Sequence, residues 1–419
     1  MRAKKYVFDL FFEKMDMEGK DFANIKSLLK NDTDNKFFLG VREDYLSIYY
    51  MGMSVATVHA LSNGGCSYSV NYKYLKGVKD KKGEYSYDDK TKGYYSLCSD
   101  VFWDKDNFNK ILRNVRNHVL GFDQSGYSYL EKACQQWIIN SNNCCTDSDW
   151  YYVDMEYIYK KDGEGNDHPF GRADIIAVSK KKEGNGKHKI AFVELKVGTD
   201  AYGISIKVPK KIQEKEEQEA YREDIVNLLR NKDGFWSDRI RKVKLGSGIA
   251  SHFVDFIHYF SEETARKQLC EEIIGILNVH KKFGLISSDN PLSSLNSADD
   301  INPIADAFIV TYSGLPGIEK SDLSEKAQAK YEVPTLVAMK AKLAKYLFDV
   351  NGSSSLPIVK LIAESEIDGL ISMKERYLEF VNNNEQQIEC IQKIKETEYR
   401  FVFRFIDIQD SGIEKSKCI

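Results

Sequence analysis

GRADIIAVSK (171–180) and HKIAFVELKVG (188–198) are two short apolar segments on either side of the polar stretch KKEGNGK. Their β-branched residues and the glycines between them are typical of two antiparallel strands joined by a hairpin turn. We expect the turn to centre near Gly184. In a regular ladder about that centre, Asp174 and Glu194 are direct cross-strand partners, with Cβ atoms roughly 5 Å apart.

The strand face that carries Glu194 also carries Phe192 and Lys196, because side chains alternate along a strand. Two carboxylates held opposite each other in an apolar sheet repel unless one is protonated or a cation lies between them. A divalent cation removes this conflict, and an all-oxygen site suits Mg²⁺ or Mn²⁺. The pattern therefore predicts that Asp174 and Glu194 bind a metal ion beside Lys196.

Segments on both sides of the hairpin predict further elements of the same domain. GYSYLEKACQQWIIN (126–140) has apolar residues at helical spacing and carries Glu131 in its first turns. WYYVDMEYIYK (150–160) is rich in aromatic and β-branched residues, as strands are. We expect another helix at 212–231 and a last core strand in IADAFIVTYSGLPG (304–317). The hairpin is thus preceded by a helix and a strand and followed by a helix and a strand.

This arrangement resembles the PD-(D/E)xK phosphodiesterase superfamily, whose members have the restriction-endonuclease-like fold. Asp174 matches the aspartate of that pattern, and Glu194, Leu195 and Lys196 match its E-x-K. Ala173 stands where the pattern has a proline, which members of the superfamily often lack. The resemblance implies that a metal is held by Asp174, Glu194 and the backbone carbonyl of Leu195.

The resemblance also implies a reaction. A metal held at this site would act as a Lewis acid on a phosphodiester oxygen and lower the pKa of a bound water. Lys196 would orient the attacking water and stabilise developing negative charge, and the nearby metal would lower the pKa of its ammonium group. Glu131 corresponds to a glutamate that the opening helix of the superfamily commonly contributes. Its alternative is a solvated carboxylate on a helix face.

We therefore expect a Mg²⁺- or Mn²⁺-dependent nuclease that hydrolyses DNA, with bacterial defence or restriction as its setting by analogy. An RNA-cutting or structure-selective nuclease is an alternative with the same chemistry. From a different class, a nuclease-fold module would bind nucleic acid or protein without catalysis, because a shared fold does not establish activity. A purely structural, salt-bridged strand end is the third alternative.

Basic residues that follow the hairpin are candidate phosphate contacts. The stretch RNKDGFWSDRIRKVK (230–244) has six basic and two acidic residues, although the whole chain has a net charge of −3. We expect nucleic acid to contact Lys207, Arg239, Arg241, Lys242, Lys244 and His252. Charge runs are more commonly solvated surfaces, and His252 has the alternative of pairing with Asp255 one helical turn away.

The length of 419 residues, with 42% hydrophobic and 29% charged residues, is ordinary for a soluble globular protein. The resemblance implies the α/β class, with α+β organisation overall. We expect an accessory α+β region at 1–125, a restriction-endonuclease-like core of a mixed sheet flanked by helices at 126–318, and a mainly helical region with a terminal strand at 319–419. The flanking regions predict a hairpin within 36–61, a loop over 77–95, helices at 104–119 (begun by Asp104 or Asp106), 334–348 and 366–396, and a strand in EYRFVFRFIDI (398–408).

Targeting features are few. No apolar run approaches the ~18 residues of a membrane helix, and the N-terminal MRAKKYVFDLFFEKMD has too short an apolar run for a signal peptide. The eight cysteines show no C-x-x-C spacing, which predicts reduced thiols rather than a zinc site. We expect a cytoplasmic protein that binds nucleic acid and no membrane. A homo-oligomer or a partner protein bound through the flanking regions stays open.

Overall fold

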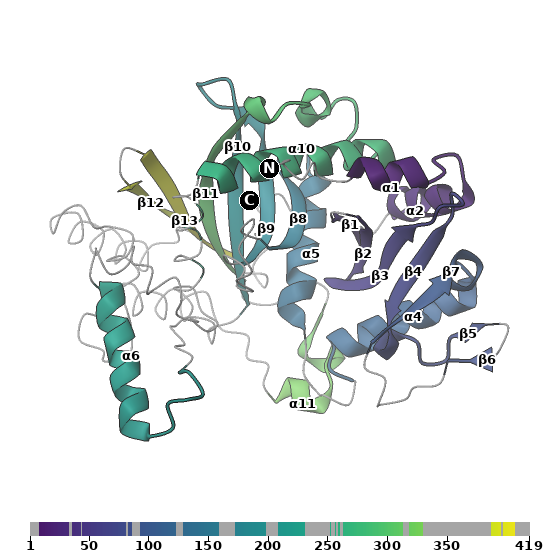
Figure 1. Cartoon of the computed structure of the whole chain (residues 1–419), viewed down its shortest axis with the longest axis horizontal. Coiled ribbons are helices and arrows are strands. Elements are labelled where there is room, and N and C mark those ends of the chain that lie inside the picture. Colours follow the sequence, from purple (N-terminus) through teal and green to yellow (C-terminus); the bar gives the residue numbers. More distant parts are fainter. Residues whose placement is uncertain are drawn as a thin grey trace.

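The computed structural model has the mixed α+β architecture that the sequence predicts. It describes residues 8–32, 36–42, 44–80, 83–85, 93–122, 129–158, 172–197, 208–230, 252, 256, 259, 263–312, 318–329, 387–394 and 397–406. Its two main sheets, one antiparallel and one mixed, both contact helix α5 (Leu130–Asn143), which lies between them (Figure 1). Among the described helices, none is both long and apolar enough to pass through a bilayer.

The sheet that carries the candidate site is mixed and has six strands. β10 is antiparallel to β9 and parallel to β11, and β11 is in turn parallel to β13. At the two edges, β8 and β12 are antiparallel to their neighbours. In order across the sheet, the strands are β12 (Gln387–Ile394), β13 (Thr397–Ile406), β11 (Ile301–Tyr312), β10 (His188–Val197), β9 (Arg172–Lys182) and β8 (Trp150–Ile158).

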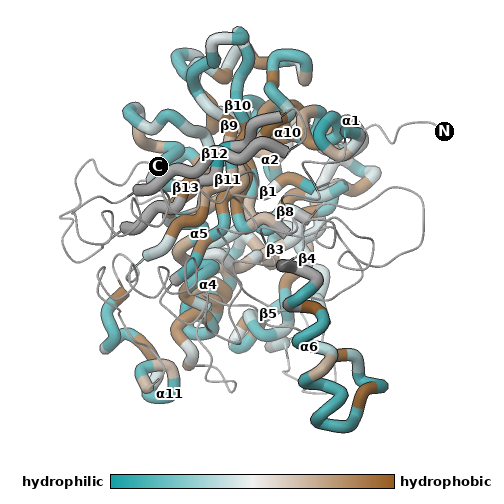
Figure 2. The backbone as a smooth tube through the Cα atoms, turned by 90° about the vertical axis from the view of Figure 1, so that its left-hand side faces the viewer, coloured by the Kyte–Doolittle hydropathy of each residue, from teal (hydrophilic) through white to brown (hydrophobic). Residues whose placement is uncertain are grey.

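The middle strands of this sheet are apolar over most of their length because both of their faces are covered. Residues 175–178 and 190–193 are all buried, and Figure 2 shows much of this part of the sheet in the colour of hydrophobic residues. Strands buried on both faces have nearly continuous apolar runs rather than strict alternation. A charged side chain on such a strand is withdrawn from water, so a partner has to offset the cost of its burial.

The β9–β10 hairpin has the predicted pairing at its open end. Val193 pairs with Ile175, so the same register places Glu194 opposite Asp174 at the next position. The regular backbone pairing of β9 with β10 ends at Val193 and Ile175, just before this position. The two acidic residues therefore lie side by side at one end of the central sheet.

The turn of this hairpin differs from the prediction. It is closed by a hydrogen bond of 2.9 Å from the N–H of Glu183 to the carbonyl of Lys187, so its centre lies one residue beyond Gly184. An irregularity in β9 then restores the predicted register. His188 pairs with Lys182 and Ile190 pairs with Val178, so four residue steps along β9 match two along β10. The two additional residues of β9 preserve the two-residue alternation of faces. The acidic side chains consequently keep their predicted face.

The N-terminal region is an antiparallel sheet with helices, which agrees with the α+β composition expected there. Helix α4 begins where the sequence predicts, and the side chain of Asp104 caps it by accepting a hydrogen bond of 3.0 Å from the N–H of Asn107. The strands in order are β1 (Phe37–Val41), β2 (Leu46–Tyr50), β3 (Met53–Ala60), β4 (Cys66–Asn71) and β7 (Tyr94–Cys98), and the helices are α1 (Phe8–Lys14), α2 (Lys20–Lys30), α3 (Ser99–Phe102) and α4 (Lys105–Val119). Part of the loop expected over 77–95 is instead the strand pair β5 (Lys79–Asp80) and β6 (Gly83–Glu84) and the start of β7.

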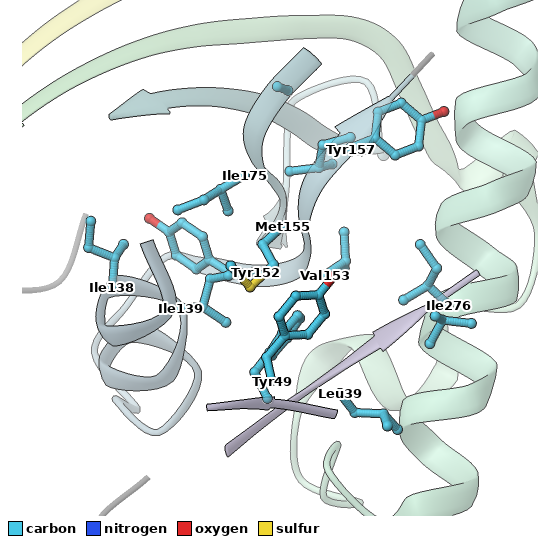
Figure 3. Packing of buried hydrophobic residues seen from close by; sticks show 14 of the residues in the cluster. Leu39, Tyr49, Ile138, Ile139, Tyr152, Val153, Met155, Tyr157, Ile175 and Ile276 are labelled. Atoms are coloured by element: carbon cyan, nitrogen blue, oxygen red, sulfur yellow. The ribbon is translucent and has the colours of Figure 1, made fainter. Parts of the chain in front are cut away.

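The two main sheets share one hydrophobic core. Figure 3 shows its centre, where buried side chains come together from the N-terminal sheet (Leu39, Tyr49), α5 (Ile138, Ile139), β8 (Tyr152, Val153, Met155, Tyr157), β9 (Ile175) and α10 (Glu263–Phe283; Ile276). An ion pair crosses the same boundary, since Nη1 of Arg42 lies 2.7 Å from both carboxylate oxygens of buried Asp154. The N-terminal sheet is therefore packed directly on the core.

One further helix and several short elements complete the described chain. The helix expected at 212–231 is α6 (Lys215–Arg230), which stands away from the central sheet (Figure 1). The remaining elements are the 3₁₀ turns Tyr72–Tyr74, Pro291–Ser294, Ala298–Asp300 and Lys320–Asp322 and the short helix α11 (Glu325–Gln328).

The C-terminal prediction is partly wrong. The strand expected in 398–408 is confirmed as β13, but the end of the helix expected at 366–396 is strand β12. Pairing with β13 decides this, because a strongly alternating strand needs a neighbour and residues 387–394 supply it. Since β13 joins β11, the central sheet extends beyond the boundary expected at residue 318. The helix expected at 334–348 lies outside the described residues.

One cysteine also departs from the expectation of reduced thiols. Cys145, which follows the end of α5, is disulfide-bonded.

Candidate functional site

Asp174 is attached to the E-x-K strand by a hydrogen bond. Its side chain is buried on β9, and Oδ2 accepts a bond of 2.9 Å from the backbone N–H of Leu195 on β10. The N–H and the C=O of one strand residue point toward the same neighbouring strand. The carbonyl of Leu195 is therefore directed to the same side as its N–H, toward Asp174.

Glu194 is completely buried, and its two oxygens have different surroundings. Oε1 accepts a short hydrogen bond from Nζ of Lys196 and lies 2.8 Å from Nε2 of His252. Oε2 is buried and has no hydrogen-bond partner among the described residues. A buried oxygen without a partner costs roughly 1–3 kcal/mol, and more when it is charged, so Oε2 is an open position for a ligand.

Lys196 lies between two carboxylates that come from different elements. Besides Glu194, its Nζ lies 3.5 Å from Oε1 of Glu131, in the first turn of α5. The side chain of Glu131 is 42% exposed, whereas that of Lys196 is 6% exposed. The glutamate therefore lies at the solvent side of the cluster, and α5 approaches the hairpin as the sequence predicts.

The electrostatics of the cluster follow from its burial and from this arrangement. Burial and the neighbouring Glu194 carboxylate hold the pKa of Asp174 well above its usual range. Burial would also raise the pKa of Glu194, but His252 and Lys196 outweigh it and lower that pKa. For Lys196, burial favours a lower pKa, yet the surrounding carboxylates outweigh it and raise the pKa. Lys196 is therefore held as a cation that can stabilise negative charge.

The donor set fits a small divalent cation. Two opposed carboxylates, with a free oxygen on Glu194 and a backbone carbonyl from Leu195, are oxygen donors of the kind that Mg²⁺ prefers. Within the described residues, no group of three or more His, Cys, Asp or Glu side chains is arranged around a single metal position. Mg²⁺ typically uses only one or two carboxylates and keeps several waters, so Asp174 and Glu194 meet its requirement.

Of the candidate nucleic-acid contacts, only His252 lies among the described residues. His252 is helical, and its ring reaches Glu194 of the acidic cluster. Phe256 and Tyr259, one and two turns further on, are also helical and pack against Phe192, which aligns this segment with the site-bearing face of β10. The alternative partner of His252, Asp255, lies outside the described residues. The same is true of Lys207, Arg239, Arg241, Lys242 and Lys244.

One acidic residue beside the site was not predicted. Glu156 of β8 has a left-handed backbone (φ 55°), and the register of β8 with β9 places it next to Asp174 on the side away from Glu194. Its carboxylate pairs with Lys132 of α5 at 3.4 Å. The sequence around Glu156 has the composition of an ordinary strand, so it contains no signal of this conformation.

Comparisons with known proteins identify no relative, so function is inferred from the site itself. No protein-family model, no curated protein and no solved structure matches the chain.

Proposed function

We propose that this protein is a divalent-metal-dependent nuclease of the PD-(D/E)xK type that hydrolyses phosphodiester bonds in DNA. The observation that carries the proposal is the juxtaposition of Asp174 with Glu194 and of Lys196 with both Glu194 and Glu131. Asp174, Glu194 and Lys196 match the sequence motif, and Glu131 corresponds to the glutamate that the opening helix of the superfamily commonly contributes. They come from α5, β9 and β10, and they meet at one end of the central sheet.

The proposed metal ligands are Asp174, the free Oε2 of Glu194 and the carbonyl of Leu195. A Mg²⁺ or Mn²⁺ ion bound there would supply Lewis acidity toward a phosphate oxygen and a bound water of lowered pKa. An ion between the two carboxylates would also offset their mutual repulsion and the burial that raises the pKa of Asp174.

The protein's own contribution is positioning and charge. The raised pKa of Lys196 keeps its ammonium group charged, which suits stabilisation of negative charge that develops on the phosphate. Its contacts with Glu194 and Glu131 hold the ammonium group in place. His252 and Lys196 both contact Oε1 of Glu194, so Oε2 is the oxygen that would bind a metal ion.

A second candidate is a nuclease-fold module that binds nucleic acid or protein without catalysis. The observation in its favour is that Lys196 and His252 already contact Glu194, so the charge of Lys196 compensates the buried carboxylate without a metal. The remaining alternatives are nucleases that cut RNA or a particular nucleic-acid structure, and they differ from the proposed function only in substrate. Bacterial defence or restriction is the setting that we propose by analogy.

The experiment is a cleavage panel with the full chain. Double-stranded DNA, single-stranded DNA and RNA are each incubated with Mg²⁺, with Mn²⁺ or with EDTA. We expect metal-dependent cleavage of DNA, and at least ~100-fold slower cleavage by Asp174→Asn and Lys196→Met. A wild type that binds nucleic acid but does not cut it favours the binding module.

A matched control comes from the same strand. Lys189 of β10 also contacts carboxylates, at 2.8 Å from Asp306 and 3.2 Å from Glu183, but it lies near the hairpin turn. Lys189→Met should therefore retain cleavage, provided that circular dichroism shows the same fold in all variants. Cleavage that survives both Asp174→Asn and Lys196→Met would refute the nuclease assignment.

A further inference from the structure

The turn between β2 and β3 is in close contact with α5, the helix that carries Glu131. Its two central residues, Met51 (φ 50°) and Gly52 (φ 74°), both have left-handed backbones, which is the geometry of a type I′ hairpin turn. A Cβ atom at Gly52 would lie 2.0 Å from the carbonyl oxygen of Lys132 and 2.7 Å from the N–H nitrogen of Ala133. These are backbone atoms of the first turn of α5, so no larger residue fits at Gly52 unless the helix moves.

A buried glutamine fixes this contact. Oε1 of Gln136 accepts a hydrogen bond of 2.6 Å from the N–H of Gly52. Nε2 of the same side chain donates to the carbonyls of Lys36 at 2.6 Å and Tyr49 at 3.3 Å. Gln136 is 2% exposed and lies four residues, or about one helical turn, after Lys132. The N-terminal half of α5 is thus bonded to the turn, to Tyr49 of β2 and to Lys36, which precedes β1.

The same helical turn faces the candidate site. Glu131 precedes Lys132, and its carboxylate lies 3.5 Å from Nζ of Lys196. Lys132 itself reaches Glu156, the left-handed residue beside Asp174, at 3.4 Å. One helical turn is therefore held by the N-terminal sheet on one side and contributes to the acidic cluster on another.

We propose that the Met51–Gly52 turn and Gln136 position Glu131 against Lys196, so that the N-terminal sheet sets the geometry of the active site. The proposal rests on the proposed nuclease function and assigns a role to the N-terminal region. Gly52 and Gln136 are positioning residues that act on the reaction through Glu131. Gly52 lies against the backbone of α5, and Gln136 joins α5 to the turn and to Tyr49 of β2. A displacement of about 1 Å in a catalytic group costs up to roughly 100-fold in rate.

The test compares two glycine substitutions with the same backbone strain. Gly52→Ala adds a methyl group that collides with Lys132, whereas Gly186→Ala, at φ 75° in the β9–β10 turn, adds one with no atom within 4 Å. We expect kcat for DNA cleavage to fall at least ~10-fold in Gly52→Ala with little change in KM, and to stay near the wild-type value in Gly186→Ala. Equal kcat values for the two variants would overturn the proposal.

A double-mutant cycle separates positioning from a general loss of structure. If Gly52 acts through Glu131, the effect of Gly52→Ala on kcat should disappear when Glu131 is already alanine. This route would be refuted if the two substitutions reduced kcat by independent factors that multiply in the double variant. It would also be refuted if Glu131→Ala had the wild-type kcat. Should Gly52→Ala fail to fold, Gln136→Met removes the hydrogen bond to the turn and enters the same cycle with a smaller expected loss, about 3-fold.

Hydrogen exchange makes the proposal testable without cleavage. Amides in peptides covering residues 129–136 should exchange faster in Gly52→Ala than in Gly186→Ala, because the first turn of α5 has been displaced. Unchanged exchange would refute the positioning role whatever the protein does to DNA. A wild type that does not cleave but shows the expected exchange difference would instead refute the nuclease function and leave the contact as a structural one.

Discussion

The backbone N–H of Leu195 donates a hydrogen bond of 2.9 Å to Oδ2 of Asp174. This contact joins the first acidic residue of the candidate site to the middle residue of the E-x-K motif. It also shows that the carboxylate of Asp174 extends across the hairpin toward β10 and not outward into solvent. Both carboxylates of the hairpin are therefore buried at one place, and their charges decide how the site responds to pH, metal ions and substitution.

Asp174→Asn should stabilise the protein in the absence of divalent ions. Burial and Glu194 raise the pKa of Asp174 in the folded chain, so the ionised carboxylate costs stability as pH rises above about 3.9, the pKa of an unfolded aspartate. An asparagine oxygen can still accept the hydrogen bond from Leu195 but carries no charge. We expect the free energy of unfolding in urea at pH 7, with EDTA present, to be higher for Asp174→Asn than for the wild type.

The same variant should respond differently to metal. A Mg²⁺ concentration 100 times the Kd would stabilise the wild type by about 2.7 kcal/mol, because only the folded chain has the site. Asp174→Asn should gain much less. An equal gain in both proteins would place the metal elsewhere.

His252→Ala should weaken metal binding. The imidazole Nε2 lies 2.8 Å from Oε1 of Glu194 and helps to orient that carboxylate. Groups that orient metal ligands typically contribute 10- to 100-fold in metal affinity or activity. We expect the Mg²⁺ concentration for half-maximal cleavage to rise at least ~10-fold. Tyr259→Phe is the control, since its hydroxyl bonds the carbonyl of Ala265.

Buried His280 should make the protein less stable in acid. Its Nε2 lies 3.1 Å from the carbonyl of Leu39, which can only accept, so Nε2 carries the proton and Nδ1 accepts from the hydroxyl of Tyr151. Burial lowers the pKa of His280 to about 4, below the value of about 6.5 in an unfolded chain. The stability contributed by the neutral ring is complete above pH 6.5 and is lost as pH falls toward 4, by about 3 kcal/mol in total.

The measurement for His280 is urea unfolding between pH 7 and pH 4. His280→Gln should be less stable than the wild type at pH 7, and the difference should shrink as the pH is lowered. Parallel stability curves for the two proteins would contradict the assignment.

Asp154→Ala should destabilise the interface between the two sheets. Removing this carboxylate leaves the guanidinium of Arg42 without its bidentate partner in a largely buried place, at a cost of about 3–5 kcal/mol. The double variant Arg42→Met with Asp154→Leu should recover much of this loss, because two apolar residues replace the pair. Thermal unfolding checks both variants, and a double variant no more stable than Asp154→Ala would show that the pair is not the cause.

The core elements around the site could be predicted from sequence because their signals are local. The helix before the hairpin, the strands β8, β9, β10 and β13 and the cap at Asp104 all depend on residue spacing over a few turns or a few strand positions. Strand β12 could not be predicted in this way, since its pairing with β13 decides its conformation. The left-handed backbone at Glu156 is likewise set by its place in the sheet and not by its neighbours in sequence.

The sequence by itself determined that Asp174 and Glu194 meet with Lys196 beside them, because a hairpin with a two-residue period brings facing positions together over a short loop. The turn centres one residue beyond Gly184, and the irregularity between His188 and Ile190 restores the register in which the two acidic residues face each other. Only the tertiary structure decided that His252 reaches Glu194, that Gly52 lies against α5, and which of the two alternatives for Glu131 holds, since its carboxylate lies 3.5 Å from Lys196. These contacts join segments far apart in the chain, and they depend on how helices and sheets pack, which no local pattern of residues records.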